Sequence, residues 1–364
     1  MKILFLANEI PDFHQDMVCH GLAELLGPEN VLVHPRIERY HSPPPGDLKV
    51  NAMSYPNLPP GPDATIEELA AEADAVVVGC LRGSALAGLR TVVRLGVDKP
   101  RAALDGLDDP YVRGAIRSVD LYFKRETLVR TARLRVRFPA RRLYYSVRPH
   151  DMWSDELRRQ IAVARVGIPK LVPLPFGVVL TPFSAAPERT HDVTFLAAAT
   201  DPVRSRIVEE LRTMRNEGYD VLIPDDPLDE HDRYRFDTRL TWAEYMQALS
   251  SSRVAVSVRG DGFDTYRYWE IPYAGALLLA ETPRTVIPDN FANGVEAVFA
   301  EPERLCDEAR RMLDSQATEP IAAAGRARLM SAHLSRHRAE VVLERLTSVR
   351  RRPAQARVSP PTPR

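Results

Sequence analysis

The sequence predicts an α/β fold made of two doubly wound domains. Short, continuously apolar segments alternate with longer amphipathic ones, which is the pattern of a parallel sheet covered by helices on both faces. The chain has 364 residues, more than one hydrophobic core usually serves. The alternation begins a second time after residues 175–191, where Pro175, Gly177, Pro182 and Pro187 predict an interdomain linker.

The first predicted domain comprises residues 1–180. Its strands are expected at Lys2 to Ala7, Asn30 to His34, Ala75 to Gly79, Arg101 to Leu104 and Leu121 to Lys124. Its helices are expected at Met17 to Leu26, Ile66 to Ala73 and Ser84 to Leu95. Residues 8–16 are expected to form a loop, and the proline-rich residues 35–63 a long irregular connection.

The second predicted domain comprises residues 190–335. Its strands are expected at Asp192 to Ala197, Tyr219 to Ile223, Val254 to Val258 and Ala276 to Ala280. Its helices are expected at Arg204 to Glu217, Trp242 to Ser250, Pro302 to Ser315 and Ile321 to Ser331. A closing helix is expected at residues 336–349. Residues 350–364 are rich in Arg and Pro and nearly free of apolar side chains, which predicts a disordered tail.

Composition narrows the class of protein. Lys and Arg number 49, as do Asp and Glu, so the formal net charge is zero, which argues against a nucleic-acid partner. The three cysteines (Cys19, Cys80 and Cys306) show no metal-ligand or disulfide spacing, and a reduced, cytoplasmic compartment is expected. The apolar run at the N-terminus is too short for a signal peptide. No segment has the length of a membrane span, although peripheral membrane contact stays open.

The most informative segment runs from Ser257 to Glu270. A strand is expected to end near Val258, and a glycine-containing loop follows it. Gly260 and Gly262 would let a ligand approach the backbone closely. A helix is then expected, with Asp264 or Thr265 as its N-cap. The unpaired N–H groups and the positive dipole of such a helix end suit a phosphate.

Three charged residues of this segment are candidates for binding a nucleotide. Arg259 and Arg267 flank the expected phosphate position and could add charge-assisted hydrogen bonds to a diphosphate. Alternatively, Arg267 could form an ion pair on its own helix. The carboxylate of Glu270, further along the helix, could accept two hydrogen bonds from a ribose diol.

Residues 241–346 resemble the C-terminal domain of the glycosyltransferase family typified by the spore-maturation protein CgeB. The resemblance rests on Trp242-Ala-Glu-Tyr245, Gly262 to Glu270, Gly275 with its apolar strand, Pro288 to Gly294, Gly325-Arg326 and Ser331 to Arg338. In the first half, Asp105 to Asp109 and Tyr122 to Glu126 resemble segments of the same relatives. The resemblance implies the GT-B fold, in which two Rossmann-like domains face each other across a cleft.

That family is related to the retaining GT-B class with a Glu-x7-Glu motif. Glu270 matches the second glutamate, so the resemblance implies that it binds the ribose. The first glutamate, which touches the donor sugar in that class, falls on Gly262. Asp261 or Asp264 could substitute for it, or the sugar is held differently. The resemblance also implies retention of configuration, a phosphate-binding Arg at Arg204 or Arg206, and neither a metal ion nor a cofactor.

Other candidates lie in expected loops and on the expected helix. Asp12, His14 and Asp16 would follow the first strand, where His14 could serve as a general base; a solvated polar loop is the alternative. The carboxylates of Asp105, Asp108 and Asp109 could bind acceptor hydroxyls. The aromatic rings of Tyr266, Tyr268 and Trp269 are expected to pack in the core or to stack on the nucleotide base. His333 and His337 are expected to be residues of the fold.

The sequence thus predicts a hexosyltransferase that uses a nucleoside diphosphate sugar. The acceptor would be a hydroxyl group of a saccharide, a lipid-linked glycan or a natural product. A catalytically silent nucleotide-sugar-binding protein of a spore coat or surface assembly, and a nucleotide-sugar epimerase on the same scaffold, are the alternatives. A dinucleotide oxidoreductase is disfavoured, because Asn8-Glu-Ile-Pro11 stands where a Gly-x-Gly-x-x-Gly turn would be needed.

Overall fold

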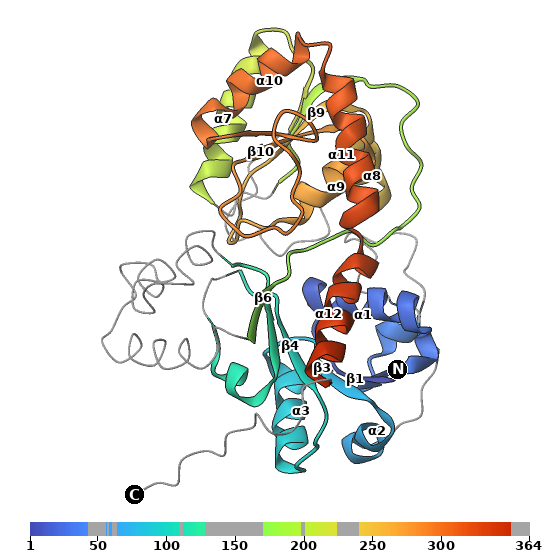
Figure 1. Ribbon diagram of the computed structural model, residues 1–364. Coiled ribbons are helices and arrows are strands. Elements are labelled where there is room, and N and C mark those ends of the chain that lie inside the picture. Colours follow the sequence, from blue (N-terminus) through green and yellow to red (C-terminus); the bar gives the residue numbers. More distant parts are fainter. Residues whose placement is uncertain are drawn as a thin grey trace, which may run out of the picture.

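The computed structural model describes residues 1–42, 56, 58–59, 64–108, 112–127, 170–197, 201–223 and 240–350. Two lobes lie one above the other, and each is built on its own parallel sheet (Figure 1). Outside the described residues lie 351–364 of the predicted tail, Asp109, and residues 43–55, 57 and 60–63 of the predicted proline-rich connection.

The first domain contains a six-stranded sheet in the order β2-β1-β3-β4-β5-β6, in which every neighbouring pair is parallel. The strands are β1 (Ile3–Leu6), β2 (Val31–His34), β3 (Ala75–Val78), β4 (Arg101–Asp105), β5 (Leu121–Lys124) and β6 (Leu171–Pro173). The helices are α1 (Phe13–Leu26), α2 (Ile66–Glu72) and α3 (Gly83–Arg94), with short 3₁₀ turns η1 (Pro28–Asn30), η2 (Glu38–His41) and η4 (Gly114–Ser118).

The second domain contains a five-stranded sheet in the order β11-β10-β9-β7-β8, again parallel throughout. Its strands are β7 (His191–Thr194), β8 (Val221–Leu222), β9 (Ser252–Ser257), β10 (Leu277–Glu281) and β11 (Val298–Ala300). Its helices are α7 (Pro202–Asn216), α8 (Trp242–Ser250), α9 (Tyr266–Ala274), η8 (Pro302–Arg304), α10 (Leu305–Leu313) and α11 (Thr318–Ala332). The predicted boundaries at residues 180 and 190 fall in the segment between β6 and β7, which has neither helix nor regular strand.

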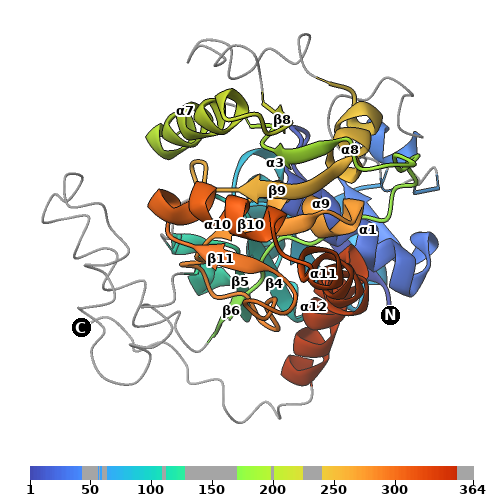
Figure 2. The same ribbon diagram turned by 90° about the horizontal axis from the view of Figure 1, so that it is seen from above.

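Both faces of each sheet are buried, which explains the continuously apolar strands. In β1, Ile3 and Phe5 belong to one core cluster, while Leu4 and Leu6 belong to the cluster on the opposite face. Seen from above, α7 and α10 lie on one side of the second sheet and α8, α9 and α11 on the other (Figure 2). The predicted doubly wound α/β class is therefore confirmed.

The last helix, α12 (Ser335–Arg350), leaves the second domain and packs on α1 of the first (Figure 1). Gly21 permits this close approach, because a Cβ there would lie 2.7 Å from the carbonyl carbon of Ser335 and 2.9 Å from Cβ of Ala339. The chain thus returns to the domain in which it began.

The strand order fixes where a ligand would bind. Chain direction across the sheet reverses between β1 and β3 in the first domain and between β7 and β9 in the second. Ligands of open parallel sheets bind beyond the carboxyl ends of the strands at such switch points. A ligand site is therefore expected at the segments that follow these four strands.

Some predicted boundaries are wrong. The loop expected over residues 8–16 ends early, because α1 begins at Phe13 with the side chain of Asp12 as its N-cap. The strands β6 and β11 were not predicted from the sequence; each has three residues and lies at a sheet edge, too short for a periodic pattern to reveal.

Candidate functional site

The candidate site is centred on α9 and on the loop of residues 258–265 that leads into it from β9. Thr265 is the N-cap, in agreement with one of the two expected positions, and its side chain makes no capping hydrogen bond. The helix ends at Gly275, which has a φ of 89° and closes the last turn. Residues 260–265 follow the carboxyl end of β9, so they lie at the switch point between β7 and β9.

Glu270 lies on α9 and is largely buried. Its Oε2 accepts a hydrogen bond of 2.9 Å from the phenol of Tyr245 on α8. Helix α8 is positioned by a capping box in which Thr241 and Glu244 satisfy each other's backbone groups. Burial, followed by the charge of Glu270, raises the pKa of the Tyr245 phenol well above its ordinary value, so the phenol remains a donor. The pair presents an oriented carboxylate.

Two guanidinium groups lie within electrostatic reach of the Tyr245 phenol, which is the hydrogen-bond partner of this carboxylate. Arg204, in the first turn of α7, is largely buried, and its Nε donates a 2.8 Å hydrogen bond to the carbonyl oxygen of Arg259. Arg267 stands one turn before Glu270, over the ring of Phe195, and its Nε and Nη1 are buried without a hydrogen-bond partner among the described residues. Burial and then the positive charge of Arg267 lower the pKa of Arg204 to about 9. An anion between the two groups would relieve this repulsion.

The other two predicted arginines are engaged elsewhere. Arg206 forms a 2.9 Å ion pair with Glu303, so of the two arginines that open α7 it is Arg204 that faces α9. Arg259 forms an ion pair with Glu281, its backbone N–H donates to the same carboxylate over 3.2 Å, and its Nε lies 3.7 Å from Asp201. Both side chains carry partners before any phosphate arrives.

Asp264 is a structural residue in this geometry. Its Oδ2 accepts a 2.7 Å hydrogen bond from the backbone N–H of Phe176, and its Oδ1 accepts one of 2.8 Å from the indole of Trp269. Burial raises the pKa of this carboxyl. Asp261, by contrast, is exposed, and its charge acts on Arg204. Of the two carboxylates expected to substitute at residue 262, Asp261 is therefore the accessible one.

The space beside Gly262 is filled by side chains of the first domain. A Cβ on Gly262 would lie 2.5 Å from Oε1 of Glu126 and 3.1 Å from Oδ1 of Asp108. The same Glu126 oxygen accepts a 2.9 Å hydrogen bond from the backbone N–H of Asp264. Arg125 donates 2.6 Å to the carbonyl oxygen of Asp264 and forms an ion pair with Asp108. Contacts across the domain junction thus hold the loop in place.

The aromatic residues of α9 pack in the interior. Tyr266 contacts the rings of Phe13 and Phe176, with centroid distances of 4.6 and 4.3 Å. Tyr268 and Trp269 are buried and contact each other. Packing, rather than an open stacking surface, accounts for these three side chains.

His14 lies in the first turn of α1 and not in the loop expected for it. It is 1% exposed, its Nε2 is 2.9 Å from the carbonyl oxygen of Leu174, and its Nδ1 has no partner among the described residues. Burial, followed by the charge of Arg125, lowers the pKa of His14 to about 3. The imidazole is therefore neutral and enclosed. Asp16, two residues further on, is fully buried against Tyr40 and Arg39.

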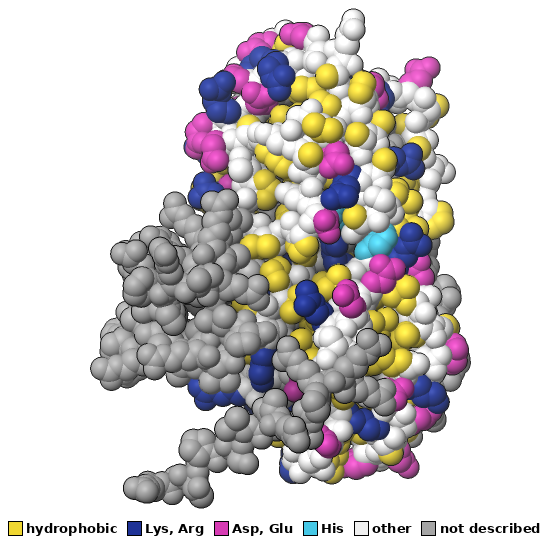
Figure 3. Space-filling view, in the orientation of Figure 1, with side chains coloured by type: hydrophobic (Ala, Val, Ile, Leu, Met, Phe, Trp, Pro, Cys, Tyr) yellow, Lys and Arg dark blue, Asp and Glu magenta, His cyan; other side chains and the backbone are white. Residues whose placement is uncertain are grey.

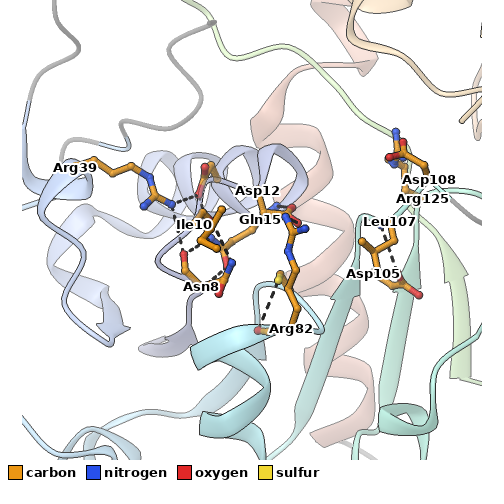
Figure 4. A network of polar contacts seen from close by, with 12 residues as sticks. Asn8, Ile10, Asp12, Gln15, Arg39, Arg82, Asp105, Leu107, Asp108 and Arg125 are labelled. Atoms are coloured by element: carbon orange, nitrogen blue, oxygen red, sulfur yellow. Dashed lines mark hydrogen bonds and ion pairs between the residues drawn. The ribbon is translucent and has the colours of Figure 1, made fainter. Parts of the chain in front are cut away.

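Acidic side chains also follow the strands of the first sheet (Figure 4). Asp12 lies 3.1 Å from Nη2 of Arg82, at the switch point of the first sheet. Asp105 is fully buried and paired with Lys124 at 3.1 Å. The side chain of Asp108 is 57% exposed and is held by Arg125. Of Asp105 and Asp108, it is thus Asp108 that is open to a ligand.

Several residues of the site were not identified from the sequence. The sequence offered Arg204 and Arg206 alike as the phosphate-binding arginine, because helix phase alone did not separate them; in the structure it is Arg204 that contacts the loop before α9. The segments that resemble the family include Tyr245, Arg125 and Glu126, but the sequence indicated no role for these three residues. His333 and His337, expected to be residues of the fold, lie where α11 passes into α12, and the imidazole of His333 is fully buried beside Trp269.

The described residues offer neither a cluster of metal ligands nor a membrane-spanning helix. They hold no group of three or more His, Cys, Asp or Glu side chains that could bind a metal ion. None of their helices is long and apolar enough to cross a membrane. On the face shown in Figure 3, basic and acidic side chains are interspersed over both lobes.

The second domain and the overall fold are both similar to known glycosyltransferases. Residues 204–344 match the family described as glycosyl transferase-like, and this range contains Arg204, Tyr245, Arg267 and Glu270. This part of the chain is similar to a glycosyl transferase-like domain. No curated protein sequence matches the chain. A relation to the CgeB group in particular stays a prediction.

Similar solved structures cover both domains. Alr3699/HepE of Anabaena, crystallised with UDP and glucose, aligns with a TM-score of 0.58 at 12% sequence identity, over 96% of this chain and 100% of that one. The same protein with UDP-glucose gives 0.57 at 13% identity, over the same shares. A glycosyltransferase of Rickettsia africae aligns with a TM-score of 0.58 at 9% identity, over 96% of this chain and 98% of that one. The predicted GT-B fold is confirmed.

Proposed function

We propose that the chain is a glycosyltransferase that transfers a hexosyl group from a nucleoside diphosphate sugar to a hydroxyl acceptor. One observation carries the proposal: two guanidinium groups and an oriented carboxylate lie together at a switch point of the glycosyl transferase-like domain. Arg204, Arg267 and Glu270 supply these groups. A site for a nucleotide donor requires two features: positive charges that bind the diphosphate, and a hydrogen-bond acceptor that binds the ribose hydroxyls.

In this arrangement, the diphosphate lies between Arg204 and Arg267 at the N-terminal end of α9. The two guanidinium groups and the helix dipole offset the charge that develops on the leaving diphosphate, and we propose that this charge compensation makes the transfer independent of a metal ion. The carboxylate of Glu270 accepts hydrogen bonds from the ribose hydroxyls, while Tyr245 holds it in orientation.

The acceptor binds on the side of the first domain, beyond the carboxyl ends of β1, β3 and β4. The ion pair of Asp12 and Arg82 lies along this edge (Figure 4). These polar groups suit an acceptor that presents several hydroxyl groups. Retention of anomeric configuration follows the family resemblance and is part of the proposal.

The first experiment measures thermal unfolding of the purified chain with UDP, GDP, TDP and ADP and their sugars. A ligand present at about a hundred times its dissociation constant stabilises the fold by about 2.7 kcal/mol. We expect UDP to give the largest shift, because the structures of HepE contain UDP. Turnover of the matching sugar nucleotide is then followed with and without saccharide acceptors, and NMR of the product reports its anomeric configuration.

The outcomes separate the competing functions. Turnover that requires an acceptor supports a transferase, while turnover to an isomeric sugar nucleotide without an acceptor identifies an epimerase. Binding without any turnover would point to the silent binding protein. If no nucleotide in the panel shifts the unfolding of a folded chain, the proposal is wrong.

A further inference from the structure

Gly262 lies in the loop that joins β9 to α9. This residue precedes α9 by a few positions, beside Asp261, whose charge acts on Arg204. A Cβ at residue 262 would lie 2.5 Å from Oε1 of Glu126 and 3.1 Å from Oδ1 of Asp108. Distances below about 3 Å do not occur between a real Cβ and its neighbours. Glycine therefore leaves the space that two carboxylates of the first domain occupy.

Glu126 occupies this space in a fixed orientation. It is 2% exposed, and its Oε1 accepts the 2.9 Å hydrogen bond from the N–H of Asp264. The preceding side chain, Arg125, donates to the carbonyl oxygen of the same Asp264. Two consecutive side chains of one domain thus pair with both backbone groups of one residue in the other. The backbone of Thr127 extends the junction by accepting a 2.6 Å hydrogen bond from Val286.

Asp108 differs from Glu126 in being open to solvent. Its side chain is 57% exposed, while the guanidinium group that holds it, on Arg125, is 2% exposed. The Nε of Arg125 is buried and has no hydrogen-bond partner in the part of the chain that the structure describes. A buried donor of this kind is costly unless a partner arrives. The buried guanidinium group of Arg125 thus orients the exposed carboxylate of Asp108, an arrangement that suits recognition of a polar ligand.

We propose that Asp108, positioned by Arg125 and Glu126, accepts hydrogen bonds from hydroxyl groups of the transferred sugar. This carboxylate reaches the site from the first domain and takes the place of a side chain that residue 262 lacks. The inference rests on the proposed function and deepens it. With the diphosphate at Arg204 and Arg267, the sugar is the part of the donor that extends toward the domain junction. Its hydroxyl groups are donors that a carboxylate recognises well.

The test compares UDP with UDP-glucose in wild type and in Asp108→Asn. The variant should bind UDP within about twofold of wild type, because the nucleotide contacts lie in the second domain. Its kcat/KM for UDP-glucose should fall about tenfold to a hundredfold, the usual range for loss of a hydrogen bond to a charged group. Asp314→Asn, an exposed aspartate at the end of α10, serves as the matched control and should match wild type in both measurements.

Two further variants test the positioning role. Glu126→Gln keeps an oxygen that can accept from the N–H of Asp264, so it should fold and bind UDP. Loss of the charge beside Arg125 should lower kcat/KM for UDP-glucose less than Asp108→Asn does. Gly262→Ala should displace both carboxylates and reproduce the Asp108→Asn defect in kcat/KM for UDP-glucose. A variant that alters only stability would change the unfolding midpoint, but it would not lower kcat/KM for UDP-glucose while leaving the affinity for UDP unchanged.

The possible failures are distinguishable. If wild type binds none of the nucleotides in the panel, the proposed function fails. If wild type binds UDP and turns over UDP-glucose, and Asp108→Asn does so with unchanged kcat/KM, the assignment of Asp108 is overturned. A parallel loss of UDP and UDP-glucose binding in a folded Asp108→Asn protein would likewise overturn it, because the defect would then lie in the nucleotide and not in the sugar.

Discussion

The phenol of Tyr245 donates a 2.9 Å hydrogen bond to the carboxylate of Glu270, and so joins α8 to α9 at the candidate ribose position. A carboxylate that is 8% exposed requires partners, because an unpaired buried charge is strongly destabilising. Tyr245 supplies one and thereby fixes the plane of the carboxylate. The site is therefore arranged before a nucleotide arrives, and the cost of ordering this side chain on binding is reduced.

Substitution of Glu270 should abolish most of the affinity for the nucleotide. Glu270→Ala removes both acceptor oxygens, and at about 1.5–3 kcal/mol for each charge-assisted hydrogen bond the dissociation constant for UDP should rise at least about tenfold. Tyr245→Phe keeps the carboxylate but loosens it, so its effect should be smaller. Isothermal titration measures both, with Glu344→Ala on the exposed side of α12 as the control. Equal affinity in Glu270→Ala and the control would remove Glu270 from the site.

Arg204 and Arg206 form a matched pair two residues apart on α7. Arg204 is buried and close to Arg267, whereas Arg206 pairs with Glu303. Arg204→Ala should therefore weaken UDP binding by about one to two orders of magnitude, and Arg206→Ala should leave it within about twofold. Titrations at two salt concentrations should show a weaker salt dependence for Arg204→Ala. The reverse order of effects would place the diphosphate on the other side of α7.

Local signals in the sequence predict most strands and the start of α9, and one of them also marks the start of α1. Asp12 with Gln15 three residues later is a capping pattern, and the side chain of Asp12 does accept from the N–H of Gln15. This pattern places the start of the helix at Phe13, so that His14 lies in its first turn and in the interior. The apolar Val and Leu runs of β3 and β10 were unambiguous because both sheet faces are covered.

The contacts across the domain junction had no such signal. Glu126 meets Asp264 across 138 positions, and no periodicity reports a pairing of that range. The glycine at residue 262 was recognised as a departure from the Glu-x7-Glu pattern, but the sequence alone offered only its own neighbours, Asp261 and Asp264, as substitutes. Packing of the two domains engages Asp264 with Phe176 and places carboxylate oxygens of Glu126 and Asp108 beside residue 262.

Acid should destabilise the fold through two buried histidines. Burial lowers the pKa of His14 and of His333 from 6.5 to about 3, so both are neutral when folded and become protonated in the unfolded chain below pH 6.5. Each then contributes a loss of stability as pH falls from 6.5 toward 3, about 2 kcal/mol between pH 6.5 and pH 5. The raised pKa values of Asp16, about 6, and Glu126, about 7, act with the opposite sign.

Because these contributions oppose each other, variants are more informative than the wild-type profile. His333→Gln should lose less stability than wild type between pH 7 and pH 5 in denaturant unfolding, whatever its stability at pH 7. Gln247→Ala, at an exposed position of α8, removes no titratable group and should keep the wild-type slope. If the slope of His333→Gln equals that of wild type, protonation of His333 does not contribute to acid unfolding.

The close approach of α1 and α12 should make Gly21 intolerant of even one methyl group. A Cβ at residue 21 would lie 2.7 Å from the carbonyl carbon of Ser335 and 2.9 Å from Cβ of Ala339, so one helix must move. Alanine would otherwise favour a helix over glycine by about 0.5–1 kcal/mol, whereas overpacking costs about 1–3 kcal/mol. Gly21→Ala should therefore unfold at lower urea concentration, while Gly114→Ala, with no atom within 4 Å of its would-be Cβ, should unfold as wild type does. A stabilised Gly21→Ala would mean that α12 lies further from α1 in solution.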